Sequence, residues 1–176
     1  MFVDESGFLL IPNVCRTWAP KGQTPHLRHH YRRDRLSVCT GLAISPKRRH
    51  LGLYLRCRPH NLNGLDIRAF LRHLLRHRRG PIDLLWDRGR PHCRREVQAF
   101  IAGHPRLRAH YFPSYAPELN PAEFVWTHTH RTLANGAPDD LVDLRHRLDG
   151  AVRRLRRSQP LLMSCIYAAD LPWSHR

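Results

Sequence analysis

Residues 114–126 combine the start of a helix with a carboxylate, and this pattern constrains the rest of the chain. Asn120 is a residue type that caps helices, because its side chain accepts a backbone N–H. Pro121 suits the first helical position, where a missing N–H costs nothing. Glu123 then falls in the first turn, where two roles are open. It either reaches back to the Asn120 backbone as a capping box, or it turns outward to do chemistry.

Two aspartates upstream favour the chemical role. Asp4 follows the apolar residues 1–3, and Asp87 follows the apolar run 82–86. Such short apolar runs are typical of buried strands, and a carboxylate at the carboxyl end of a strand points into the crevice where open α/β sheets bind ligands. With Glu123, they predict three converging carboxylates, which are the oxygen ligands that hard divalent cations prefer. Two such cations held roughly 4 Å apart activate water and stabilise the leaving oxygen in phosphodiester cleavage.

Three further acids stay open as alternatives. Glu5 and Glu118 are the reserves if the three acids are assigned one position off. Asp83 lies in the second apolar run, but it would begin that strand rather than end it. Because close carboxylates without a metal repel one another, at least one acid of the cluster should hold its proton more tightly than usual.

The order of the expected elements is three strands, a helix, a strand, a helix, a strand and further helices. Apolar patterning predicts strands over 2–4 continued by 9–11, and over 36–44, 51–57, 82–86 and 107–112. It predicts helices from a cap at Asp66, over 92–102, over 121–133 and from 139–140 to 157, and it leaves 161–173 without a place. The first three strands form an antiparallel meander. This order predicts an α/β chain with a ribonuclease-H-like fold, in which helices flank a mixed five-stranded sheet, as a single domain over residues 1–176.

Several local motifs resemble the DDE transposases of the mariner-like insertion-sequence group. They are Val3-Asp4-Glu5-Ser6, Arg16-Thr17-Trp18-Ala19-Pro20-Lys21-Gly22, Leu85-Trp86-Asp87 with His92 five residues on, and Tyr115 to Glu123 with Trp126. Between Asp87 and Glu123 stand 35 residues, and the resemblance covers about residues 1–157. It departs at Arg88, where Asn is usual, at Ala116, where Ser is usual, and at His128, His130 and Arg131, where lysines are common.

The resemblance implies metal-dependent cleavage of DNA and joining of the 3′ ends to target DNA. Asp4, Asp87 and Glu123 would hold two Mg²⁺ or Mn²⁺ ions. The implied partner is DNA, bound by a homodimer at the element ends. The family's N-terminal helix-turn-helix region is not seen before Asp4, so we expect end recognition to come from a separate polypeptide or a fused product. The resemblance also places the chain in the bacterial cytoplasm, on the nucleoid.

The charge of the chain points the same way. A formal net charge of +16, from 30 basic and 14 acidic residues, favours a polyanionic partner, with nucleic acid as the default. Only Lys21 and Lys47 are lysines, so nearly all basic residues are arginines. This bias toward arginine is also explained in part by a GC-rich genome. The candidate DNA contacts are Lys21, Arg32, Arg33, Arg88, His92 and Arg131. The basic loop 21–34 either grips DNA or is a solvated connection, and His92 either positions water or phosphate or is a surface residue at a helix start.

Other features exclude several classes of protein. No apolar run approaches the roughly 20 residues of a membrane span, so we expect a soluble chain with no membrane partner. Five scattered cysteines without a CxxC pair argue against a zinc ribbon and a disulfide framework. Trp18 is expected in the core rather than as an exposed hairpin residue. Two alternatives to a transposase remain: an inactive relic that binds nucleic acid through its charge, and another ribonuclease-H-like nuclease.

Overall fold

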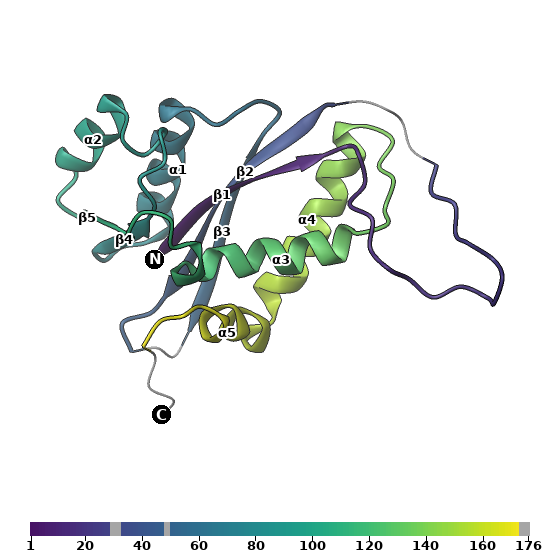
Figure 1. Ribbon diagram of the computed structural model, residues 1–176. Helices are drawn as coiled ribbons and strands as arrows, with labels where there is room; N and C mark the ends of the chain where they lie inside the picture. Colours follow the sequence, from purple (N-terminus) through teal and green to yellow (C-terminus); the bar gives the residue numbers. More distant parts are fainter. Residues whose placement is uncertain (29–32, 48–49, 173–176) are drawn as a thin grey trace.

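A mixed five-stranded sheet forms the centre of the computed structural model, which describes residues 1–28, 33–47 and 50–172 (Figure 1). Its strands are β1 (Phe2–Leu9), β2 (Arg35–Ile44), β3 (Leu51–Arg58), β4 (Ile82–Trp86) and β5 (Leu107–Tyr111), in the order β3-β2-β1-β4-β5. β1, β2 and β3 pair antiparallel, which confirms the predicted meander. β4 pairs parallel with β1, and β5 with β4, so the connections after β3 run through helices.

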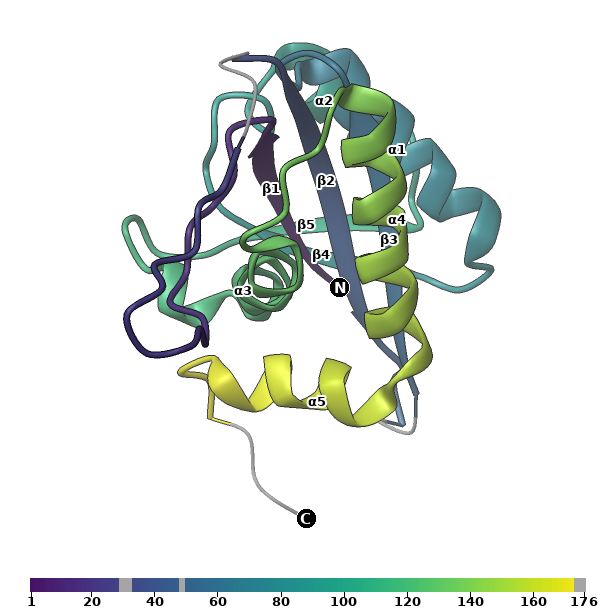
Figure 2. The same ribbon diagram turned by 90° about the vertical axis from the view of Figure 1, so that its right-hand side faces the viewer.

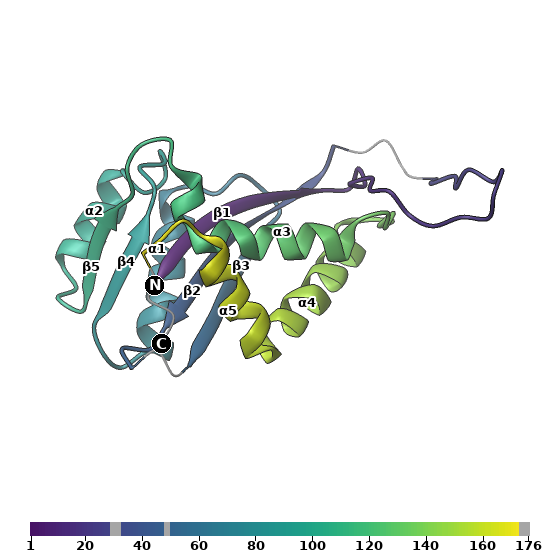
Figure 3. The same ribbon diagram turned by 60° about the horizontal axis from the view of Figure 1, so that its bottom comes forward.

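Helices cover both faces of this sheet (Figures 1 and 3). They are α1 (Gly64–His77), α2 (Arg95–Ala102), a short 3₁₀ turn η1 (Pro117–Leu119), α3 (Pro121–Leu133), α4 (Leu141–Arg157) and α5 (Gln159–Ala168). One core cluster joins α1 and α2 to the sheet, and a second joins α3, α4 and α5 to the other face. The expected arrangement of helices around a mixed sheet is therefore confirmed.

The alternation of side chains along β1 assigns its residues to the two faces. Phe2 and Phe8 belong to the core cluster under α3, α4 and α5, whereas Val3 belongs to the cluster under α1 and α2. Because successive side chains of a strand point to opposite faces, Asp4 lies on the α3 face and Glu5 on the α1 face. The two adjacent acids of β1 thus serve different layers of the molecule.

Two helix starts differ from the sequence-based expectation. Asn63, not Asp66, caps α1: its Oδ1 accepts the N–H groups of Leu65 and Asp66, and Asp66 completes the capping box from the third helical position. α2 begins at Arg95 rather than His92, because His92 belongs to a turn in which its N–H donates to the Gly89 carbonyl.

Of residues 161–173, which had no predicted place, residues 161–168 belong to α5, residues 169–172 follow it, and residue 173 lies outside the described residues. α5 packs on α3, α4 and β3. Figure 2 shows it below α3 and beside the end of α4. Ser158 ends α4 and caps α5, because its Oγ accepts the N–H of Leu161. The Gln159 amide then pairs with both backbone groups of Leu51, at 2.8 and 2.9 Å, and so fixes α5 to the edge of the sheet.

The segment between β1 and β2 projects away from the body of the molecule (Figures 1 and 3). The start of this segment is held by Asn135, whose side chain exchanges two hydrogen bonds with the backbone of Cys15, at 2.8 and 3.0 Å. Trp18 lies farther out and is 100% exposed. The expectation that Trp18 belongs to the core is therefore wrong, because its segment leaves the sheet before the tryptophan is reached.

Cysteine and membrane features complete the fold. All five cysteines are free thiols in the structure, and Cys39, Cys57 and Cys165 are buried. Within residues 1–28, 33–47 and 50–172, no helix is both long and apolar enough to cross a membrane.

The core beneath α4 gives a direct test of the packing. Leu148 is 0% exposed, whereas Val142 on the same helix is 76% exposed. Leu148→Ala should lower the free energy of unfolding by about 2–5 kcal/mol, since it leaves a cavity in a packed core. Val142→Ala should change it by less than about 0.5 kcal/mol. Urea denaturation followed by circular dichroism measures both, and equal losses would contradict the assigned core face of α4.

Candidate active site

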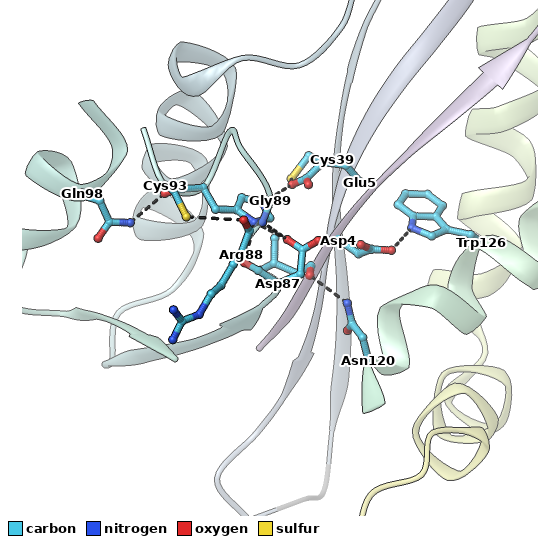
Figure 4. A network of polar contacts seen from close by, with 12 residues as sticks. Asp4, Glu5, Cys39, Asp87, Arg88, Gly89, Cys93, Gln98, Asn120 and Trp126 are labelled. Atoms are coloured by element: carbon cyan, nitrogen blue, oxygen red, sulfur yellow. Dashed lines mark hydrogen bonds and ion pairs between the residues drawn. The ribbon is translucent and has the colours of Figure 1, made fainter. Parts of the chain in front are cut away.

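The three predicted acids line one cavity of about 390 Å³. Asp4 lies on β1, Asp87 follows the last residue of β4, and Glu123 lies in the first turn of α3. Phe2 of β1 pairs with Leu85 of β4 in parallel register, so Asp4 and Asp87, two residues farther along each strand, stand level with one another. The loop 112–117 closes the cavity on another side. Figure 4 shows Asp4 and Asp87 close together near Asn120.

The start of α3 fixes Glu123 in this cavity. Asn120 caps the helix as predicted, with Oδ1 accepting the N–H of Ala122 at 3.2 Å. Its backbone N–H donates to the carbonyl of Pro117 at 2.9 Å, so the donor that a capping box would use already has a partner. The Asn120 Nδ2 group donates to the carbonyl of Val3 at 3.2 Å and ties the helix start to β1. Glu123 is therefore directed to the cavity rather than to the helix cap.

Asp4 is the acid that holds its proton most tightly. It is 9% exposed, and its Oδ2 accepts the indole N–H of Trp126 at 2.7 Å. Burial, reinforced by the charges of Glu123 and Glu5, raises the pKa of Asp4 to about 8. Burial and then the charge of Asp87 raise the pKa of Glu123. One carboxyl with a raised pKa was expected from mutual repulsion, yet burial is the larger cause.

Asp87 has the opposite character. Its Oδ1 accepts the N–H of Gly89 at 2.8 Å and lies 2.8 Å from Nδ1 of His92. The hydrogen bond from His92, with a smaller contribution from Gly89, lowers the pKa of Asp87. Within the described chain both donors reach Oδ1, so Oδ2 stays available to a cation. Gly89 is required here, because a Cβ at this position would meet Asp87 Oδ1 at 2.9 Å.

His92 is a buried charged residue and not a surface contact. It is 0% exposed, and its ring stacks on Trp86 with the centroids 4.3 Å apart. Nε2 lies 2.8 Å from Oε1 of Glu5, while Nδ1 faces Asp87. Burial disfavours the charged ring, but the hydrogen bonds to Asp87 and Glu5 outweigh it and raise the pKa of His92 to about 10. The burial of His92 contradicts the expectation of a surface residue at a helix start and leaves no exposed side chain for a direct contact with DNA. The role of positioning water or phosphate stays a prediction.

Glu5 is the functional residue that sequence reasoning missed. It was held only as a reserve for Asp4, whereas the structure makes it the second partner of His92. Its position next to Asp4 on a strand is the available signal, because adjacent strand residues point to opposite faces. This pattern gives the face on which Glu5 lies, whereas its partner His92 is decided by the packing of the layers.

The remaining predicted residues lie in different places. Arg88 lines the acid cavity, with its guanidinium 5.4 Å from the centre of the Tyr111 ring. Arg131 lines a neighbouring pocket of about 690 Å³ that shares Glu123 with the acid cavity. Lys21 and Arg33 are exposed on the projecting segment, and Arg32 lies outside the described residues.

The other acids do not join the cluster. Glu118 is exposed in η1 and does not line the cavity. Asp83 lies at the other end of β4, where Oδ1 is 3.2 Å from Nε2 of His110. Asp4, Asp87 and Glu123 therefore stand as the cavity acids, with Glu5 in its different role.

The donor set fits hard divalent cations in chemical type. Three carboxylates surround one cavity, and two of them have raised pKa values, as expected for acids without a counter-charge. In the described part of the chain, no three His, Cys, Asp or Glu side chains lie close enough to hold one ion as they stand. Shared coordination therefore requires a change of side-chain rotamer around the cavity.

Asp4→Asn should stabilise the metal-free protein at neutral pH. A carboxyl whose pKa of about 8 in the folded protein exceeds its ordinary value of 3.8 favours folding below pH 3.8, and this contribution is lost as the pH rises to about 8. The neutral amide avoids that loss, so the melting temperature should rise at pH 7–8 and the gain should vanish near pH 4. Thermal melts in chelator measure this. Asp170→Asn, at an exposed position, is the control, and an equal gain there would contradict the burial of a protonated Asp4.

His92→Ala should lower the free energy of unfolding by about 3–5 kcal/mol, because it leaves a cavity where a fully buried ring stacked on Trp86 and also removes the partner of Glu5. His110→Ala is the matched control, since its pair with Asp83 is exposed and contributes about 0–1 kcal/mol. A raised histidine pKa stabilises the folded protein fully below the ordinary value of 6.5, and this contribution is lost as the pH rises through about 10. Denaturant unfolding in chelator at both ends of this range measures the effect. A difference between wild type and His92→Ala that grows toward pH 10 would contradict the charged His92.

Comparisons with known proteins agree with this geometry. Residues 1–145 match the family model of the DDE superfamily endonucleases. The Mos1 mariner paired-end complex with Mn has a TM-score of 0.63 at 16% identity, over 98% of this chain and 56% of that one. The Mos1 strand transfer complex gives 0.61 at 16% over 98% and 55%, and the Mos1 catalytic domain gives 0.57 at 14% over 98% and 82%. No protein of curated function has a significantly similar sequence.

These likenesses confirm the expected ribonuclease-H-like fold. The chain spans a little over half the length of the transposase chains in the two complexes. The family match extends from β1 into α4 and includes all three cavity acids. The chain therefore belongs to the DDE superfamily endonucleases, as its resemblance to mariner-like transposases predicted.

Proposed function

We propose that this chain is the catalytic part of a transposase, which cleaves DNA phosphodiester bonds and joins the 3′ ends to target DNA. The observation that carries the proposal is the convergence of Asp4, Asp87 and Glu123 on one cavity in a DDE endonuclease. The similar Mos1 structures are described as paired-end and strand transfer complexes, one of them with Mn, which supports DNA as substrate and a divalent cation as cofactor.

In this proposal Asp4, Asp87 and Glu123 hold two Mg²⁺ or Mn²⁺ ions. When bound, such ions lower the pKa of the attacking water or 3′-hydroxyl and stabilise the leaving oxygen. Asp87 is ready to bind, because His92 and Gly89 keep it ionised and occupy only Oδ1. Asp4 gives up its proton on binding, because a cation reverses the electrostatic preference for the neutral acid. Trp126 meanwhile holds Asp4 Oδ2 and so orients the carboxylate.

Arg88 is proposed as the phosphate contact at this cavity. Its side chain is exposed, lines the same cavity as the acids and rests on the Tyr111 ring. A planar guanidinium binds phosphate oxygens through two parallel hydrogen bonds. A phosphate held there would lie beside the three carboxylates, where the attack takes place.

The wider assembly belongs to the same proposal. Both helical layers pack on a single sheet, which supports residues 1–176 acting as one catalytic domain. A homodimer on two element ends is proposed because the similar Mos1 structures are paired-end complexes. Recognition of the end sequence by a helix-turn-helix region, on this polypeptide or on a separate one, would direct the cleavage to the element.

Nicking of supercoiled plasmid tests the acid cavity. Purified protein should nick the plasmid with Mg²⁺ or Mn²⁺ and not with chelator. Asp87→Ala and Glu123→Ala should each reduce nicking to the level of the chelated sample, because each removes a proposed metal ligand. Asp83→Ala, which removes an aspartate at the far end of β4, should keep wild-type nicking. Agarose gels of the relaxed product measure the rate.

The outcomes separate the candidate functions. Equal loss of nicking in Asp83→Ala and Asp87→Ala would contradict the assigned cavity. Wild-type protein that binds DNA in a salt-sensitive way but does not nick it with either metal would favour the inactive relic. Nicking without joining of pre-cut 3′ ends would instead favour another nuclease of this fold.

A further inference from the structure

The edge of the sheet formed by β3 carries a second, cationic pocket. This β3-edge pocket has a volume of about 500 Å³ and is lined by residues 50–55, by His73 and His77 of α1, by Arg156 of α4 and by Gln159 of α5. It shares no residue with the acid cavity. The proposed cleavage reaction does not use it.

Positive side chains are crowded around this pocket. Burial, together with the nearby Arg58 and Arg76 guanidiniums, lowers the pKa of Arg56. Burial and then the neighbouring His77, Arg56, Arg156 and Arg76 lower the pKa of His73. Burial is the larger cause of both shifts, and the nearby like charges add to it, so positive side chains lie close to one another at this edge of the sheet.

One acid only partly offsets these charges. Asp66 forms an ion pair with Arg58 at 2.8 Å and so neutralises that guanidinium. Arg76 and Arg156 are exposed. The Nε of Arg56 is buried and has no hydrogen-bond partner within the described chain. Arg156 lines the pocket, and Arg56 and Arg76 lie outside the lining but near its residue His73. This group of guanidiniums would be stabilised by an anion.

The pocket is not a free strand edge awaiting another strand. Arg156 Nε donates to the carbonyl of Leu53 at 2.9 Å, and the Gln159 amide occupies both backbone groups of Leu51. These bonds fix α4 and α5 against β3. A guanidinium has five N–H donors, so Arg156 keeps others for a ligand. The free donors of the pocket are thus charged side chains, which favours a phosphate-rich partner over a peptide strand.

The position of the pocket separates it from the scissile phosphate. Tyr54 of β3 pairs with Gly41 of β2, which in turn pairs with Val3 of β1, so the pocket lies two strands from the acids. Tyr54 and His73 lie on the α1 side, where their rings are 6.3 Å apart, whereas Asp4 faces α3. A phosphate in the acid cavity therefore cannot also contact His73 or Arg76.

We propose that the β3-edge pocket binds phosphate groups of a second segment of duplex DNA, apart from the segment in the acid cavity. The choice of DNA rests on the proposed function, but the binding itself does not require cleavage. Arginine guanidiniums match phosphate oxygens, and each neutralised phosphate releases counterions. Joining one DNA to another requires two DNA segments on one protein, and this surface supplies a second contact.

The test compares two pairs of arginines that carry the same charge. The pocket variant is Arg76→Gln with Arg156→Gln. The matched control is Arg95→Gln with Arg108→Gln, two exposed arginines on α2 and β5, next to the opposite edge of the sheet. Arg56→Gln with Arg76→Gln is a second pocket variant, which keeps the bond from Arg156 to β3. It replaces the first if loss of that bond unfolds the protein, as judged by circular dichroism.

Fluorescence anisotropy with a short duplex of random sequence, in chelator and over a range of salt, gives the affinity and its salt dependence. The pocket variant should bind more weakly, and its slope of log K against log salt should be smaller in magnitude by about two, one for each lost phosphate contact. The control should keep the wild-type slope. Equal changes in both variants, or none in the pocket variants, would overturn the proposal.

A second arm separates DNA from an anionic membrane. Vesicles containing phosphatidylserine replace the duplex in a sedimentation assay. Weaker vesicle binding by the pocket variant, with its DNA slope unchanged, would assign the pocket to a lipid surface and overturn the proposal. Because all binding is measured in chelator, the result stands whether or not the plasmid is nicked. If the protein fails to nick DNA but shows the predicted salt dependence, the proposed cleavage function is contradicted and the proposed DNA-binding pocket is supported.

Discussion

The two adjacent acids of β1 determine how the candidate site is built. A strand sends consecutive side chains to opposite faces, so Asp4 and Glu5 cannot serve the same layer. Asp4 meets Trp126 of α3 on one face, and Glu5 meets His92 on the other. His92 in turn holds Asp87, so a single central strand positions both aspartates of the cavity from opposite sides. Every other part of the site is arranged around this strand.

The electrostatics of the two aspartates are complementary. Asp4 is buried with a raised pKa, whereas Asp87 has a lowered pKa because a charged histidine lies against it. The metal-free protein therefore keeps one neutral and one ionised aspartate side by side, which limits the repulsion between them. Ionisation of the buried Asp4 carboxyl lowers the stability of the folded protein. A cation in the cavity would offset this loss, because it favours the ionised carboxylate. The metal-free protein is thus more stable with Asp4 protonated, whereas the proposed activity needs Asp4 ionised.

Side-chain hydrogen bonds fix α3 to the central strand β1. Asn120 caps the helix and also bonds to the carbonyl of Val3, and Trp126, six residues later, bonds to Asp4. These two contacts fix the start of the helix to β1, and so they place Glu123 between them. At the β3 edge of the sheet, Arg156 of α4 and Gln159 of α5 donate hydrogen bonds to the strand. The β3-edge pocket is therefore lined by side chains from α1 on one face and from α4 and α5 on the other.

Local patterns were enough to predict most of the fold. The apolar runs of β1 and β4, the Asn120-Pro121 cap and the order of strands and helices depend on residues close together in the sequence. The same patterns led to Asp4, Asp87 and Glu123. Asp87 follows a strand end and Glu123 a helix start, whereas Asp4 lies inside β1, because the strand continues to Leu9 instead of ending at Asp4. They were less reliable where a helix has two possible caps, as at Asn63 and Asp66, and where the chain lacks a clear period, as in α5.

The sequence by itself was enough to predict the strands, the main helices and the three acids, because short apolar patterns and helix-capping residues indicate them. Only the tertiary structure decided which side chains are buried and with whom. His92 has a raised pKa because Asp87 faces one of its nitrogens and Glu5, 87 residues away, reaches the other. Trp18 is exposed because its segment leaves the sheet. Such pairings depend on distant residues that meet only when the layers pack, and no local pattern in the sequence records them.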